Sequence, residues 1–267
     1  MIQRVNMHKK EFNQEKINQI INCLCNSIKP EKVFMEFATI FQDMTDLIFV
    51  QDMIETLTFA ISSSPNYKAL RGKLFGTVPT DFAKNREELF THLYNSWCIN
   101  PISTLTLCLL SQKYELAYNL LNHLSDELDS KKLIQLGTLV QLIESPSFVQ
   151  LRLQLMKQTE ENKYLIKTLQ GILMILPQSK TFQVLKTRLD CVNITNFSLP
   201  FVSDEGKLVD DNGDVQESAE SEAQRLKQKE QEAAQKRKAI ISCLKQFELQ
   251  QERYSKYIHE QLVMQQM

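Results

Sequence analysis

The feature that most constrains the fold is a nearly regular spacing of helix starts in the second half of the chain. Asn100, Ser130 and Asn162 each stand before an apolar stretch of helical periodicity, 30 and then 32 residues apart. We predict that each is a helix N-cap, because such side chains accept hydrogen bonds from the unpaired amides of a first turn. Each interval has room for two helices. Helix pairs repeating at such a period form α-solenoids, since one pair alone cannot bury its apolar face.

Prolines and serines place the boundaries within the pairs. Pro101 follows the first N-cap, and Pro177 ends the first helix of the last pair. Ser145 with Pro146, and later Ser179, begin the second helix of their pairs. Pro101, Pro146 and Pro177 are therefore predicted to have structural roles, because proline fits a first helical turn but not a helix interior. The expected pairs are 101–111 with 113–125, 131–144 with 146–157, and 163–176 with 179–190.

The first hundred residues follow a helical pattern too. Apolar residues at 17, 20, 21, 24, 25 and 28 form one stripe, Pro30 suits the first turn of a second helix, and Asp46 can cap a third. A fourth helix is expected from about 85 to 97. The 6 glycines and 7 prolines are too few for a turn-rich all-β protein. We predict an all-α fold of stacked antiparallel helix pairs, α-solenoid or HEAT-like, over residues 15–192, after a flexible N-terminus at 1–14.

The character of the sequence changes near residue 193. Residues 203–222 contain eight acidic side chains and one lysine, which predicts a disordered acidic linker over 193–218. Residues 219–267 then form an amphipathic, coiled-coil-like helix, whose heptad seam is mostly apolar only from Ile240 to Ile258. We predict that Ile240, Leu244 and Phe247 bind a partner surface. That surface could be an equivalent tail, the groove of the helical stack, or another protein.

Composition narrows the class of protein. The formal net charge is −1 in 267 residues, which argues against binding to nucleic acid or to a membrane surface through charge alone. The N-terminal residues carry no secretory signal pattern, and the longest apolar run is too short to span a bilayer. Six cysteines spread through helical patterns indicate buried thiols in a reducing compartment. We therefore expect a cytoplasmic protein.

Trp97 and Cys98 are the residues that most resemble a reactive site. A catalytic cysteine needs a base such as histidine, and His92, six positions before Cys98, falls on another face of the same predicted helix. We therefore predict that Trp97 and Cys98 are structural. The C-x-C at Cys23 and Cys25 does not have the spacing of zinc knuckles. No catalytic residue, cofactor or metal is expected.

Three long blocks resemble the C-terminal domain of the ArPIKfyve family, the vacuole-morphology scaffolds of the endosomal PIKfyve lipid-kinase complex. The blocks are 96–121, 139–156 and 162–192, in the same order as in the family, and the resemblance extends over roughly 15–192. Trp97-Cys98, Asn100-Pro101, Pro146 and the Leu-Pro-Gln-Ser at 176–179 are all in place.

The resemblance implies a non-enzymatic scaffold that binds a Sac-type phosphoinositide phosphatase and assembles with copies of itself. A PIKfyve-type lipid kinase is implied only through the complex, and membrane association only as peripheral contact at endosomes or vacuoles through partners. Tyr118, Gln141, Arg152 and Tyr164 are the predicted partner contacts, because packing does not require them and because Arg and Tyr are frequent in interface hot spots. The alternative is a free-standing α-helical adaptor in membrane traffic.

Overall fold

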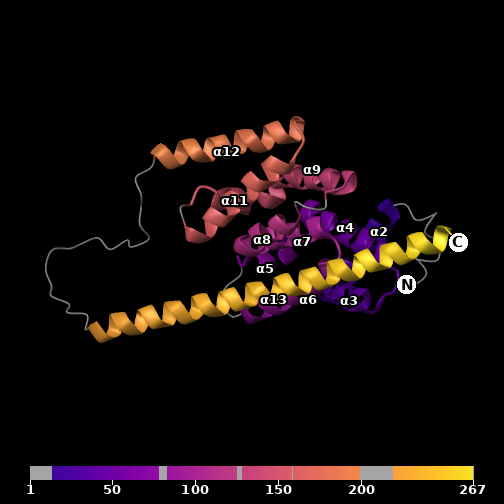
Figure 1. Cartoon of the computed structure of the whole chain (residues 1–267), viewed down its shortest axis with the longest axis horizontal. Helices are drawn as coiled ribbons and strands as arrows, with labels where there is room; N and C mark the ends of the chain where they lie inside the picture. Colours follow the sequence, from indigo (N-terminus) through magenta and orange to yellow (C-terminus); the bar gives the residue numbers. More distant parts are fainter. Residues whose placement is uncertain (1–13, 78–82, 125–127, 158, 199–218, 267) are drawn as a thin grey trace.

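The computed structural model describes residues 14–77, 83–124, 128–157, 159–198 and 219–266. Within these residues every regular element is a helix, so the predicted all-α class is confirmed. Figure 1 shows the shorter helices packed beside one another as a stack and one long helix lying across it. The predicted flexible segment 1–13 and most of the predicted linker, 199–218, lie outside the described residues.

Three helices begin the stack, and local sequence explains their ends. They are α2 (Gln14–Ser27), α3 (Pro30–Asp43) and α4 (Leu47–Ser63). Pro30 occupies the first turn of α3, as predicted. The Asp46 carboxylate caps α4 by accepting a hydrogen bond from the Phe49 amide at 3.0 Å. Helix α4 is hydrophobic on several faces and contributes Val50, Ile54, Leu57 and Ile61 to the core.

A short helix follows that the sequence pattern did not predict. The 3₁₀ turn η1 (Pro65–Tyr67) leads into α5 (Lys68–Phe75), and α6 (Ala83–Trp97) comes next and packs against α3. Helix α5 ends at Gly76, whose φ of 77° is left-handed and therefore suits glycine. Eight residues give too few turns for a periodic stripe to stand out, which is why α5 was missed.

The three predicted helix pairs are present. They are α7 (Pro101–Leu110) with α8 (Tyr114–Leu124), α9 (Ser130–Glu144) with η3 (Pro146–Phe148) and α10 (Val149–Gln154), and α11 (Glu160–Ile175) with α12 (Lys180–Ser198). The N-cap prediction is correct at Asn100, whose Oδ1 accepts from the Ser103 amide. It is wrong at Ser130 and Asn162. Asp129 and Thr159 are the caps there, because each acidic or hydroxyl oxygen lies one turn before the amide it binds.

Two of the helix pairs share a sequence motif. Ser-Pro-x-[Tyr/Phe]-x-x-Leu-Arg occurs at 64–71 and again at 145–152. In both copies the aromatic residue and the leucine are buried, and the arginine donates to main-chain carbonyls at the end of the preceding helix. The units α4–η1–α5 and α9–η3–α10 are therefore built alike, which supports the description of the fold as stacked repeats.

The long helix α13 (Ala219–Gln266) crosses the stack and packs on it over its second half. Phe247 is 4% exposed and belongs to the same core as Trp97 and Leu136. The predicted seam residues Ile240 and Leu244 pack against that core, whereas side chains from 233 to 239 are exposed. Of the surfaces considered for this helix, the structure pairs it with the chain's own stack.

Helix α12 continues past the predicted end of the stack. The sequence pattern placed the end of the domain at residue 192, whereas the helix runs to Ser198. Val192 is the last residue of α12 that belongs to the core, so the apolar pattern ends before the helix does. The loss of hydrophobic periodicity marked the end of packing rather than the end of the element.

Candidate partner-binding site

Trp97 is the centre of the core where α6 meets α3 and α4. Its side chain is fully buried, its ring lies 6.4 Å from that of Phe41, and its indole Nε1 donates to the Thr58 hydroxyl at 2.8 Å. Thr58 in turn donates to the Ile54 carbonyl at 2.7 Å. A buried indole N–H normally needs such a partner, and here one is supplied from within α4. The arrangement explains why this position holds tryptophan rather than phenylalanine.

Cys98 lies beside Trp97 in an environment that suppresses thiolate chemistry. Its side chain is fully buried, and burial raises the pKa of its thiol well above the ordinary value. Cys108 is also fully buried, and desolvation raises its pKa as well. A reactive cysteine needs a lowered pKa and access to its substrate. Cys98 has neither, so the geometry does not support a nucleophile here.

Polar contacts fasten α13 to the stack next to this core. The Tyr94 hydroxyl donates to the Cys243 carbonyl at 3.0 Å, and Tyr254 donates to the Gln51 side chain at 2.7 Å. Gln251 donates through Nε2 to the carbonyl oxygen of Cys98 at 2.5 Å. The sequence pattern treated Gln251 as an interruption of the apolar seam. In the structure it satisfies a carbonyl at the end of α6, where the helix itself leaves oxygens unpaired.

The four predicted polar contacts lie in different settings. Arg152 is turned inward and donates through Nη1 to the carbonyls of Ile143 and Ser145. Gln141 is exposed on α9. Tyr118 on α8 and Tyr164 on α11 come together, with ring centroids 6.0 Å apart. Of the four, this last pair forms a cluster, and it does so where the two helices have their most extensive contact.

A lysine that sequence reasoning missed completes the cluster. Lys167 is exposed on α11, one turn from Tyr164, and its Nζ lies 5.4 Å from the centroid of Tyr164 and 5.9 Å from that of Tyr118. Both rings are half-buried, so their faces are held in place while their edges reach solvent. We call Tyr118, Tyr164 and Lys167 the tyrosine–lysine patch. The i, i+3 spacing of 164 and 167 was visible in the sequence, but the pairing with 118 required the fold.

The tyrosine–lysine patch is suited to recognition. Preordered aromatic rings offer large contact area at little entropic cost, and the ammonium can pair with an acidic side chain of a partner. No group of three histidine, cysteine or acidic residues in the described part of the chain could hold a metal ion. No helix in that part is long and apolar enough to cross a membrane.

Comparison with known proteins agrees with this architecture. A family model for the vacuolar protein 14 C-terminal binding domain matches residues 10–192. The chain belongs to this family. The match covers the whole stack up to Val192, including every residue of the tyrosine–lysine patch, and stops before α13. The family resemblance found in the sequence is thereby confirmed.

Curated relatives of this Vac14-type domain come from fungi and plants. Protein VAC14 homolog of Schizosaccharomyces pombe is 43% identical over 183 residues, 68% of this chain and 22% of that protein. Vacuole morphology and inheritance protein 14 of Saccharomyces cerevisiae is 39% identical over 178 residues, 66% of this chain and 19% of that protein. The Arabidopsis thaliana VAC14 homolog is 40% identical over 185 residues, 67% and 24% respectively. The chain thus matches about a fifth of each relative's length. No solved structure gives a significant match.

Proposed function

We propose that this chain is a non-enzymatic scaffold that binds a Sac-type phosphoinositide phosphatase. The observation that carries the proposal is the match of residues 10–192 to a family whose description is the binding of such a phosphatase by the C-terminal region of vacuolar protein 14. The buried, high-pKa state of Cys98 is consistent with a binding module rather than an enzyme. By holding the phosphatase, the scaffold would support the synthesis and turnover of phosphatidylinositol 3,5-bisphosphate.

We propose the tyrosine–lysine patch as part of the phosphatase-binding surface, with Gln141 as a separate exposed candidate on α9. The patch combines the residue types that dominate interface hot spots with rings that are already ordered. Arg152 is a weaker candidate than the sequence suggested, because both of its observed hydrogen bonds stay within the chain. The tail residues Ile240, Leu244 and Phe247 would act indirectly, by holding α13 on the stack.

Direct binding to a purified Sac-type phosphatase tests the proposal. Wild-type chain should retain the phosphatase in a pull-down, and the triple variant Tyr118→Ala, Tyr164→Ala, Lys167→Glu should weaken the Kd at least about 30-fold, since losing a hot spot costs ~2 kcal/mol or more. Gln170→Ala, an exposed change on the same helix, should bind like wild type. A wild-type chain that binds no Sac phosphatase and instead captures other membrane-traffic proteins would favour the free-standing adaptor.

We further propose that copies of the chain associate with one another and that a PIKfyve-type kinase joins only through the complex. Self-association is supported by large apolar side chains left exposed on α13, among them Leu249, Leu262 and Met264. Attachment to endosomal or vacuolar membranes would then be peripheral, through these partners. Light scattering on the full chain and on a Leu262→Glu, Met264→Glu variant tests the first part, because the variant should shift toward the monomer mass.

A further inference from the structure

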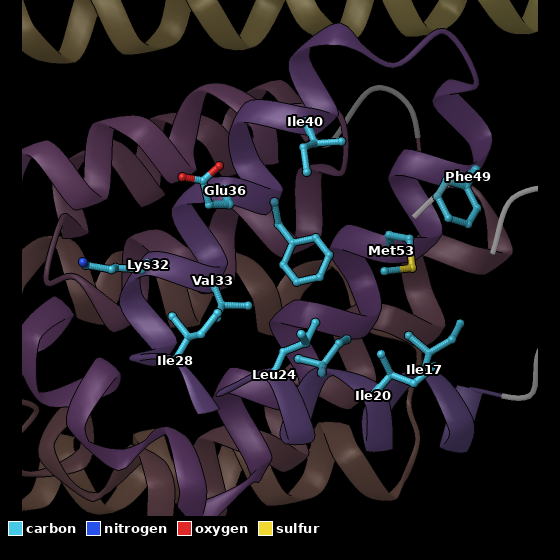
Figure 2. Close-up of a pocket in the computed structure, with 12 residues that line it drawn as sticks. Ile17, Ile20, Leu24, Ile28, Lys32, Val33, Glu36, Ile40, Phe49 and Met53 are labelled. Carbon is cyan, nitrogen blue, oxygen red and sulfur yellow. The ribbon is translucent and has the colours of Figure 1, made fainter. Parts of the chain in front are cut away.

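An apolar groove of about 420 Å³ lies at the beginning of the stack, between α2, α3 and α4 (Figure 2). Its lining is almost entirely aliphatic and aromatic and includes Ile20, Leu24, Phe37 and Met53. The charged residues of the lining are Lys32 and Glu36, and Figure 2 shows both at one edge. A site for a small polar ligand needs several converging polar groups, and this groove does not have them among its described lining residues.

The groove exists because α2 is apolar on two faces. Ile21 and Cys25 point into the core and are 1% and 8% exposed. Ile20, Leu24 and Ile28 line the groove instead, and Ile28 is 50% exposed. Across the groove, Ile40 of α3 is 39% exposed. In a stacked helical fold the terminal unit is usually polar on its outer side, because no neighbour covers it. The outer side of α2 has the character of an internal unit.

We propose that residues 1–13 of this chain dock in the groove as an amphipathic helix. The segment joins α2 at Gln14, and the groove begins at Ile17, less than one turn further along. It contains neither proline nor glycine. Ile2 and Val5 lie on one side of a helix, with Met1 beside them, while Gln3 and Asn6 lie on the other.

The length of the segment fits the groove. The groove extends along α2 from Ile17 to Ile28, which is about 16 Å at the rise of an α-helix. If two or three residues before Gln14 form the connecting turn, residues 1–10 make a helix of roughly 15 Å. The basic side chains Arg4, Lys9 and Lys10 could then pair with Glu36 at the edge of the groove.

Hydrogen exchange on the full chain tests the docking. Ile2→Asp with Val5→Asp should raise amide exchange in α2 by at least about ten-fold, because uncovering the groove lowers the local opening free energy of that helix. Gln3→Asp with Asn6→Asp adds the same charge to the other side of the segment and should leave exchange in α2 as in wild type. Equal exchange in all three proteins would overturn the proposal.

Disulfide trapping separates the alternative occupants. Val5→Cys with Ile40→Cys, in a Cys23→Ser, Cys191→Ser background, should cross-link within one chain at any protein concentration. Cross-linked dimers that increase with concentration would overturn the proposal in favour of a second copy in the groove. Normal exchange in the Ile2→Asp, Val5→Asp protein together with lost phosphatase binding would assign this end of the chain to the phosphatase instead. The docking does not depend on the proposed phosphatase function.

Discussion

Arg71 of α5 and Arg152 of α10 hold the same hydrogen-bonding position in two helix pairs that lie 81 residues apart in the sequence. Each donates through Nη1 to two main-chain carbonyl oxygens at the end of the helix before it. Helix ends leave such carbonyls without partners, and a guanidinium with several donors can satisfy two of them at once. The arginine therefore fixes the bend between the first helix of a pair and the second.

Replacing Arg152 by alanine should lower the free energy of unfolding by about 2 kcal/mol, because two hydrogen bonds from a charged donor are lost. Arg71→Ala should have a similar effect, since its contacts are equivalent. Urea denaturation gives the measurement. If Arg152→Ala abolished phosphatase binding without changing stability, the residue would be a partner contact, as the sequence alone suggested.

The buried thiols predict a loss of stability at alkaline pH. Burial raises the pKa of Cys98 and of Cys108 in the folded chain, so the unfolded chain releases these protons at lower pH than the folded chain. Stability should therefore be complete below about pH 8.5 and fall as the pH rises above it, by up to ~1.4 kcal/mol per pH unit for each thiol. Urea melts between pH 8 and pH 10 measure the slope.

The matched variants are Cys98→Ala and Cys108→Ala. Each should make the decline with pH shallower, because one buried thiol no longer titrates only in the unfolded chain. Cys23→Ala, at an exposed position, serves as the control. An alkaline decline of the same steepness in all four proteins would show that groups other than Cys98 and Cys108 cause it.

Truncating Phe247 should destabilise the stack. The side chain is 4% exposed and part of the common core, so Phe247→Ala should cost about 3–5 kcal/mol. Leu249, two residues on and 58% exposed, provides the control, since Leu249→Ala should change stability by less than ~0.5 kcal/mol. Thermal or urea unfolding followed by the fluorescence of Trp97 reports on the stack directly. Equal, small effects of both changes would mean that α13 is a separate unit, as the sequence predicted.

The sequence predicted the helices of the stack well because their apolar stripes are local and regular. The stripe at 17–28, the proline at 30 and the N-cap at 100 all depend on residues within one or two turns of each other. The prediction failed where two neighbouring polar residues compete for one cap. Asp129 and Ser130 are both good caps, and only the backbone geometry decides which one binds the amide of Lys132.

The candidate site was less predictable, because it depends on which helices meet. Tyr118 and Tyr164 were both identified from the sequence, but nothing local to either of them shows that α8 and α11 bring their rings together. The role of α13 was missed for the same reason. Its seam looked incomplete at Gln251 until the carbonyl of Cys98, more than a hundred residues away in sequence, supplied the partner.

The helical glycines Gly137 and Gly171 give opposite predictions for the same substitution. Among the described residues, Gly137 of α9 has no atom within 4 Å of the position where a Cβ would lie. Gly137→Ala should therefore stabilise the fold by about 0.5–1 kcal/mol, since alanine restricts the unfolded backbone and favours a helix. A Cβ on Gly171 of α11 would lie 2.5 Å from Cδ2 of Leu121 on α8.

Leu121 is 3% exposed, so it cannot turn away from a new methyl group without disturbing the core. Gly171→Ala should lose its helix-propensity gain and destabilise by about 1–2 kcal/mol, because overpacking forces side chains off their rotamers. Adding Leu121→Ala to Gly171→Ala should then cost less than Leu121→Ala alone, since the new methyl occupies part of the space that the leucine leaves. Urea denaturation of the four proteins measures this coupling. Additive effects would mean that α8 and α11 are further apart at this point than the Gly171–Leu121 contact implies.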